Sequence, residues 1–125
     1  KKISGRVVYT DRLAPLSEEF GNNILELLKK NSDLDGIFAT SDVMAANIIR
    51  ACKKMGKRVP EDISIVGFDD TWISTLTYPS ITTIHQPVQE MCEYAIEAIV
   101  KKVKSEKVPS QVVFPVELID RESTK

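Results

Sequence analysis

The chain has 125 residues, with 17 basic and 18 acidic side chains and a formal net charge of -1. This length provides one domain with its own hydrophobic core and excludes two, and the balanced charge gives no positive field for direct binding of nucleic acid or an anionic membrane. No apolar run approaches the ~20 residues of a membrane span, and residues 1–10 lack the apolar core of a secretory signal. We therefore expect a soluble protein.

Strand-like and helix-like segments alternate in the first half of the chain. The β-branched run at residues 5–10 predicts a strand, and a stripe of apolar side chains predicts a helix over residues 17–31. Residues 37–40 predict a second strand, after which Ser41 or Asp42 is expected to cap a second helix. This order of strand and helix is typical of α/β domains.

The second half continues the same order. Residues 63–68 are apolar without alternation, which indicates a strand buried on both faces of a parallel sheet. Residues 81–84 predict a short fourth strand, Pro87 suits the first turn of a long amphipathic helix over residues 88–104, and residues 111–120 predict an edge strand. The repeated units predict a doubly wound, mostly parallel sheet with helices on both faces.

The two cysteines, Cys52 and Cys92, each lie in a helical apolar pattern and not in a Cys-x-x-Cys motif. We interpret both as small buried hydrophobic residues, and not as a disulfide or a metal-binding pair. Free thiols are typical of a reducing compartment, so the sequence predicts a cytoplasmic protein.

Acidic residues follow two of the predicted strands. Asp42 comes after the second strand, and Asp69 and Asp70 come directly after the third. Right-handed crossovers place the carboxyl ends of parallel strands along one edge of the sheet, so these side chains border the crevice where α/β proteins bind ligands. A carboxylate at the end of a buried strand needs hydrogen-bond donors or a cation, and no basic residue lies nearby in sequence. This crevice is the candidate site.

The polar residues at the crevice have alternative interpretations. Asp69 is either a turn residue that bonds the amides of its own loop or an acceptor for hydroxyl or amine groups of a ligand, and we favour the ligand. Asp70 is assigned the structural role, with the reverse assignment as the alternative. Both Ser41 and Asp42 are suitable helix caps; we expect Asp42 to cap and Ser41 to face the crevice.

Three other features also have more than one interpretation. Trp72 suits stacking on a ring-shaped ligand, a subunit contact or packing of its loop. His85 has no second ligand at metal-binding spacing, so we expect a hydrogen-bonded residue and neither a metal ligand nor a general base. The basic residues within 53–58 complement the negative end of a helix dipole and lack the aromatic interleaving of a nucleic-acid surface.

Sequence motifs of the common enzyme classes do not occur. The patterns GxSxG, HExxH, GxxxxGK[ST] and GxGxxG are missing, so we expect no enzyme, no cofactor and no metal ion. Paired aspartates can hold magnesium for phosphoryl transfer, which makes a magnesium-dependent phosphotransfer or phosphatase domain the enzyme alternative. However, the aspartates are adjacent and lack the Asp-x-Asp spacing of haloacid-dehalogenase-type phosphatases.

Four longer motifs occur in order, namely SDVMA at residues 41–45, RVPEDISIVGFDD at 58–70, PSITTIHQP at 79–87 and LIDREST at 118–124. With this combination the chain resembles the carboxyl-terminal part of lactose-repressor/galactose-repressor (LacI/GalR) family transcriptional regulators. The resemblance covers nearly the whole chain and is weakest before Gly36. Sugar-binding proteins of transporters share the fold and are a further alternative.

The resemblance implies a two-lobed effector-binding domain of periplasmic-binding-protein type, without the family's helix-turn-helix and most of its first lobe. In the family, the residue matching Asp69 contacts a sugar or nucleobase-like effector, and so does the residue matching Ser41. An aromatic platform usually follows the first strand, where Arg12 and Leu13 stand here. Residues 88–115 are expected to belong to, or pack on, the first lobe. The predicted effector-binding residues are Asp69, Ser41, Asp42, Trp72, Leu13 and Arg12.

The same resemblance implies a homodimer, formed by an isologous contact of the second predicted helix and the loop after Asp70. DNA is then bound only through a helix-turn-helix outside this chain, and the effector changes operator binding by shifting the closure of the two lobes. The predicted contact residues are Ala46, Ile49, Arg50, Ile73, Leu76 and Tyr78.

Overall fold

The computed structural model describes residues 18–125, with side chains from Gly21 onward. Helices and strands alternate in the order α1 Glu18–Lys30, β1 Gly36–Phe38, α2 Asp42–Lys54, β2 Ser64–Val66, α3 Ile73–Leu76, β3 Thr83–His85, α4 Val88–Val103 and β4 Glu117–Ile119. The elements predicted from residue 17 onward are confirmed, although the strands are shorter than predicted, and α3 is additional. The strand predicted at residues 5–10 lies outside the described residues.

The strands of the body run in parallel. β1 pairs with β2, with Gly36 opposite Ser64 and Phe38 opposite Val66. Parallel bridges then join Val66 to Thr82 and Asp69 to His85, so the chain leading into and along β3 runs beside β2. This pairing, together with the alternation of helices and strands, confirms the predicted α/β class.

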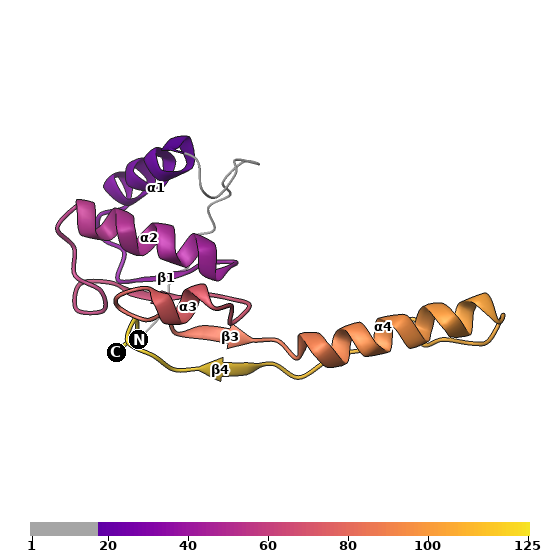
Figure 1. Ribbon diagram of the computed structural model, residues 1–125. Coiled ribbons are helices and arrows are strands. Elements are labelled where there is room, and N and C mark those ends of the chain that lie inside the picture. Colours follow the sequence, from indigo (N-terminus) through magenta and orange to yellow (C-terminus); the bar gives the residue numbers. More distant parts are fainter. Residues whose placement is uncertain (1–17) are drawn as a thin grey trace.

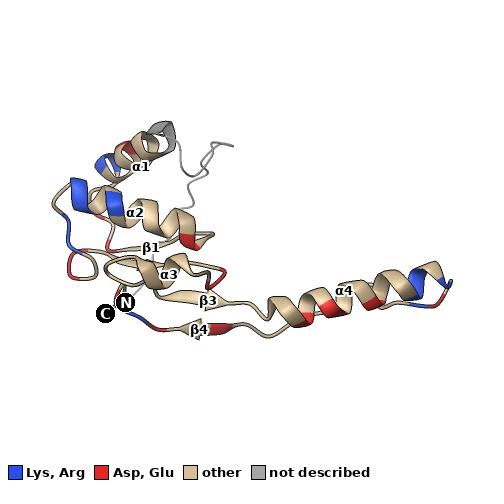
Figure 2. Ribbon diagram, in the orientation of Figure 1, with Lys and Arg blue, Asp and Glu red and all other residues tan. Residues whose placement is uncertain are grey.

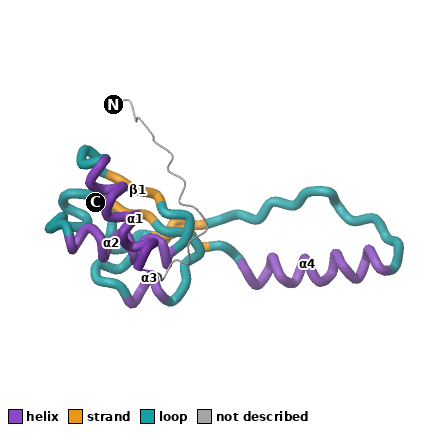
Figure 3. Tube along the Cα trace, turned by 90° about the horizontal axis from the view of Figure 1, so that it is seen from above, coloured by secondary structure: helices purple, strands orange, loops and turns teal. Residues whose placement is uncertain are grey.

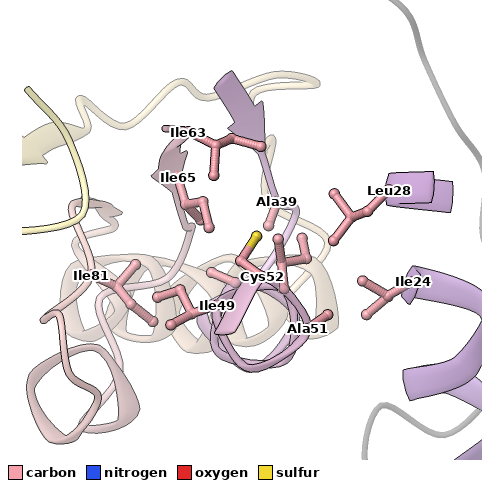
Figure 4. Packing of buried hydrophobic residues seen from close by; sticks show 11 residues of the cluster. Ile24, Leu28, Ala39, Ile49, Ala51, Cys52, Ile63, Ile65 and Ile81 are labelled. Atoms are coloured by element: carbon pink, nitrogen blue, oxygen red, sulfur yellow. The ribbon is translucent and has the colours of Figure 1, made fainter. Parts of the chain in front are cut away.

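The hydrophobic core lies between the first two helices and the parallel strands (Figures 1 and 4). Ile24 and Leu28 of α1 belong to one buried cluster with Ala45, Ile48 and Cys52 of α2 and the fully buried Ile65 of β2. The remaining buried hydrophobic residues of this core are Ala39, Ile49, Ala51, Ile63 and Ile81. The prediction of a buried Cys52 is thus confirmed, and burial raises the pKa of its thiol.

An arm projects from this body. β3 pairs antiparallel with β4, and beyond this pair α4 and residues 104–116 extend away from the body (Figures 1 and 3). None of the residues of α4 is buried, although the ring of Tyr94 meets that of Phe114 at 5.8 Å between centroids. The apolar stripe of this amphipathic helix is exposed in the structure, with Ile99 63% and Val103 82% exposed.

The expectation that Cys92 is buried is wrong. Cys92 lies on α4 and is exposed, whereas the sequence predicted a buried thiol. The helical apolar pattern around Cys92 is present, but no described part of the chain covers that face of α4. An apolar stripe therefore predicts which side of a helix can be buried, and not whether a partner is there to bury it.

Basic residues lie in the last turns of the longer helices α1, α2 and α4 (Figure 2). Lys53 and Lys54 lie in the last turn of α2, in agreement with their predicted role at the negative end of the helix dipole. Arg58 forms an ion pair with Asp62 at 2.8 Å in the loop that follows. From Glu18 to the end of the chain, no helix is both long enough and apolar enough to span a bilayer.

Candidate functional site

The carboxyl ends of the parallel strands lie on the side of the body from which the arm extends (Figure 1). The predicted acidic residues meet there, Asp42 at the start of α2 and the pair Asp69 and Asp70 in the loop beside β3. The backbone N–H of Asp42 donates to the Phe68 carbonyl at 2.9 Å, which joins the two strand ends directly. The rim predicted from strand order is therefore confirmed as one cluster.

Asp42 is a structural residue of this cluster. Its side chain is fully buried, and its carboxylate accepts hydrogen bonds from the Thr71 N–H at 2.6 Å, the Thr71 hydroxyl at 3.0 Å and the Thr83 hydroxyl at 2.5 Å. A buried carboxylate with both oxygens occupied has no free face for an effector. The expectation that Asp42 contacts the effector is thus wrong.

Ser41, not Asp42, caps α2. The Ser41 hydroxyl accepts a hydrogen bond from the Met44 N–H at 3.2 Å, and its backbone is extended, as is typical of an N-cap residue. The prediction that Asp42 caps α2 is therefore wrong, because its carboxylate accepts from three other donors of Thr71 and Thr83. With its hydroxyl used in the cap, Ser41 is a weaker candidate for an effector contact.

Asp69 has the geometry expected of a ligand-binding acceptor. It is half-buried, and only its Oδ1 accepts a hydrogen bond from a described residue, from Gln86 Nε2 at 2.8 Å. Its backbone N–H donates to the Ile84 carbonyl at 3.0 Å, which holds it at a φ of 101° that non-glycine residues rarely adopt. Such backbone strain is common at binding sites, where the surrounding contacts maintain it. One carboxylate oxygen is therefore held and the other can accept a further hydrogen bond.

Asp70 forms the structural member of the pair, as predicted. Its carboxylate accepts from Arg121 Nη2 at 2.6 Å and lies 3.0 Å from His85 Nδ1. Burial alone raises the pKa of this carboxyl, but the bonds to Arg121 and His85 together outweigh burial and lower the pKa below its ordinary value. The prediction that His85 is a hydrogen-bonded residue at a strand end is also confirmed.

The structure places the remaining predicted residues at three kinds of position. Trp72 is exposed directly before α3, and Leu76 and Tyr78 are exposed in and after α3. Ile49 was predicted to lie in a subunit contact, but it is only 7% exposed and packs in the core. Within α2, Ala46 is half-buried and Arg50 is exposed, and in α3 Ile73 is half-buried. The predicted contacts of Arg12 and Leu13 lie outside the described residues.

Two contacts at the site were missed in the sequence. Gln86 and Arg121 each bind one of the adjacent aspartates, and both lie within the motifs PSITTIHQP and LIDREST that carried the resemblance. Arg121 lies far from Asp70 in the sequence, and only the tertiary fold brings the two side chains together. Sequence spacing therefore could not predict this pair.

The arrangement suits recognition by hydrogen bonds. One oxygen of Asp69 accepts from Gln86, and the carboxylate of Asp70 is already paired with a cation, Arg121. Within residues 18–125, no group of three or more His, Cys, Asp or Glu side chains is placed to hold a metal ion. An ionised carboxylate that accepts from a hydroxyl forms a stronger bond than a neutral acceptor does. The site can therefore bind a polyhydroxylated or amine-bearing small molecule.

The family profile and the similar proteins identify the same family for this chain. The profile of the periplasmic binding protein-like domain matches residues 7–124. The HTH-type transcriptional regulator MalR of Clostridium butyricum is 42% identical over 81% of this chain, which spans 30% of that protein.

Solved structures agree with this match. The transcriptional regulator CelR–cellobiose complex superposes with a TM-score of 0.77 at 33% identity, over 82% of this chain and 32% of that one. The lac repressor dimer bound to operator and the anti-inducer ONPF superposes with a TM-score of 0.76 at 28% identity, over 82% of this chain and 36% of that one. The chain thus spans between 30% and 36% of the length of these three proteins.

Proposed function

Because the chain belongs to the family of periplasmic binding protein-like domains found in LacI-type transcriptional regulators, we propose that it is the carboxyl-terminal part of the effector-binding domain of such a regulator. In this role it binds a small molecule and has no catalytic activity of its own. The longer protein binds operator DNA through a helix-turn-helix domain and acts in the cytoplasm. The DNA-binding proposal is supported by the names of two similar proteins, an HTH-type transcriptional regulator and a lac repressor dimer bound to operator.

The proposal rests on the carboxylate of Asp69, which has one hydrogen-bonded oxygen and one that can still accept a bond. Its Oδ1 accepts from Gln86, and among the described residues none donates to Oδ2. A sugar hydroxyl or a nucleobase amine is the kind of donor that this oxygen can accept. A sugar is the favoured class, since the similar CelR structure is a complex with cellobiose.

The other half of the site is proposed to lie on a first lobe. The arm formed by α4 and the segment after it, residues 88–115, carries an apolar face that no part of the described chain buries. Burying that face against the first lobe places the effector between two lobes, next to the strand ends that carry Asp69. Effector binding then shifts the population toward one closure of the lobes.

We further propose that the protein acts as a homodimer through the surface around α3. Trp72, Leu76 and Tyr78 are 71%, 72% and 89% exposed, which is unusual for large apolar and aromatic side chains that lie close together in sequence. Arg50 of α2 and Ile73 of α3 complete the predicted patch, since α2 and α3 are packed against each other. An isologous contact of this kind matches an operator read by two identical heads.

A thermal-shift screen of the full-length regulator tests the effector site. The panel contains ribose, maltose, cellobiose, lactose and xylulose together with adenine and guanine. A compound present at about 100 times its Kd adds ~2.7 kcal/mol to the free energy of unfolding and raises the Tm. We expect the Asp69→Ala variant to lose this rise and Asp33→Ala, which changes an exposed turn residue after α1, to keep it. A rise that persists in Asp69→Ala, or a panel without any rise, contradicts the proposed site.

A further inference from the structure

One arginine joins three parts of the chain beside the candidate site. Arg121 follows β4 and donates from Nη2 to Asp70 Oδ1 at 2.6 Å. Its Nη1 donates to the Ser74 hydroxyl at 3.0 Å and to the Ile81 carbonyl at 2.9 Å. The side chains of Arg121 and Asp70 are only 18% and 17% exposed, so solvent screens their ion pair far less than a surface pair.

These bonds fix the segment 70–81 at its two ends and in its middle. Asp70 begins the segment, Ser74 lies in α3, and Ile81 ends the segment. Ser74 and Ile81 are both fully buried, and the Ile81 N–H donates to the Ser74 carbonyl at 2.7 Å. The inner side of the segment is therefore closed onto the body, and its conformational freedom is already restricted before it meets any partner.

The outer side of segment 70–81 carries the exposed side chains of Trp72, Leu76 and Tyr78. Aromatic side chains are enriched in the buried centres of protein interfaces, where they contribute most of the binding energy. A surface whose backbone is fixed in advance binds more tightly, because less ordering entropy is lost on association. The contacts of Arg121 therefore bear directly on how well this surface can associate.

We propose that Arg121 is a positioning residue for subunit association, which holds segment 70–81 in the conformation that presents Trp72, Leu76 and Tyr78 to a second copy of the chain. This inference rests on the homodimer proposed above. Arg121 does not itself touch the second copy; it acts through Asp70, Ser74 and the Ile81 carbonyl. A second copy is the partner that fits, because an isologous contact pairs this segment with the same segment, whose one charged residue, Asp70, is already paired with Arg121.

The guanidinium group is required for this role. Its planar fork reaches an acceptor on each of its two terminal nitrogens, whereas a lysine ammonium is a point charge on a flexible stem. Arg121→Lys therefore keeps the positive charge beside Asp70 and loses the simultaneous bonds to Ser74 and Ile81. The neighbouring Asp69 is bonded to Gln86 and not to Arg121, so the effector contact stays intact in this variant.

Sedimentation equilibrium of the full-length regulator provides the test. The matched control is Arg58→Lys, since Arg58 is likewise an arginine paired with an aspartate, Asp62, which it bonds through Nε and Nη2 in the loop between α2 and β2. We expect Arg121→Lys to raise the dimer dissociation constant by at least about tenfold, the effect of losing one or two hydrogen bonds to a charged group. Arg58→Lys is expected to leave it within about twofold of the wild type.

The outcomes separate this inference from the proposals on which it rests. A wild-type dimer whose dissociation constant is unchanged in Arg121→Lys overturns the positioning role and leaves the homodimer standing. Equal weakening by both lysine variants also overturns it, because it indicates a general loss of stability. A monomeric wild type refutes the homodimer and this inference together. If circular dichroism shows Arg121→Lys to be unfolded, Asp70→Asn, which keeps the side-chain shape and removes the ion pair, is measured against the same criteria.

Discussion

Replacing Gly67 by alanine perturbs the packing that holds the candidate site together. A Cβ atom at this position meets Asp42 Oδ1 at 2.5 Å and Ile81 Cγ2 at 3.0 Å, so a neighbour has to move. The carboxylate of Asp42 is buried and bonded to Thr71 and Thr83, and it cannot rotate away without breaking those bonds. Overpacking costs about 1–3 kcal/mol and the loss of a bond to a charged group about 1.5–3 kcal/mol, so we expect a destabilisation of about 3 kcal/mol.

The assay is urea denaturation of the full-length protein, followed by circular dichroism, with Gly21→Ala as the control. Gly21 lies inside α1, and a Cβ atom there meets nothing within 4 Å. Alanine in a helix interior is favoured over glycine by roughly 0.5–1 kcal/mol, so the same chemical change is expected to stabilise at this position. A Gly67→Ala variant within about 0.5 kcal/mol of the wild type would refute the close approach of Gly67 to Asp42.

Three further predictions concern the cap, the ion pair and the thiols. Ser41→Ala removes the N-cap of α2 and is expected to cost about 1 kcal/mol in urea unfolding, whereas no loss contradicts the cap. Because the pKa of Asp70 is lowered in the folded state, its contribution to stability is fully present above the ordinary pKa of about 3.9 and is lost as the pH falls below that value. The free energy of unfolding of Asp70→Asn should therefore depend less on acid pH than that of the wild type. Equal slopes of unfolding free energy against pH for the two proteins contradict the pairing. Iodoacetamide should modify the exposed Cys92 of the isolated chain faster than the buried Cys52, whose thiol pKa is raised by burial. In the full-length protein the proposed packing of the arm on a first lobe should slow the reaction of Cys92, and an unchanged rate contradicts that packing.

Local patterns predicted most of the fold of residues 18–125. The continuous apolar run around Ile65 correctly predicted a buried parallel strand. The helical spacing of Ile24, Leu28 and Ile48 correctly predicted which helix faces are buried in the core. These predictions succeed because the period of apolar residues depends on the same backbone geometry that places side chains on one face. Helix α3 has only four residues and no such period, which explains why it was missed.

The site was harder to predict because its bonds join distant parts of the chain. Serine and aspartate are equally good helix caps, so the sequence could not show that Asp42 would bond Thr71 and Thr83 and leave the cap to Ser41. The apolar stripe of α2 likewise contains both core and surface positions, and Ile49 falls in the core. The identification of Asp69 as the ligand acceptor rested on the residues and on the family resemblance, and that of Asp70 as the structural residue rested on the residues alone. The structure confirms the role of Asp70, and that of Asp69 stays a prediction.

A crystal structure of the full-length regulator, with the compound that gives the largest thermal shift bound, tests the central claim most directly. The account predicts a hydroxyl or amine of that compound within about 3.2 Å of Asp69 Oδ2, while Gln86 still donates to Oδ1. A compound bound elsewhere, with the Asp69 carboxylate turned onto its own loop, would contradict it.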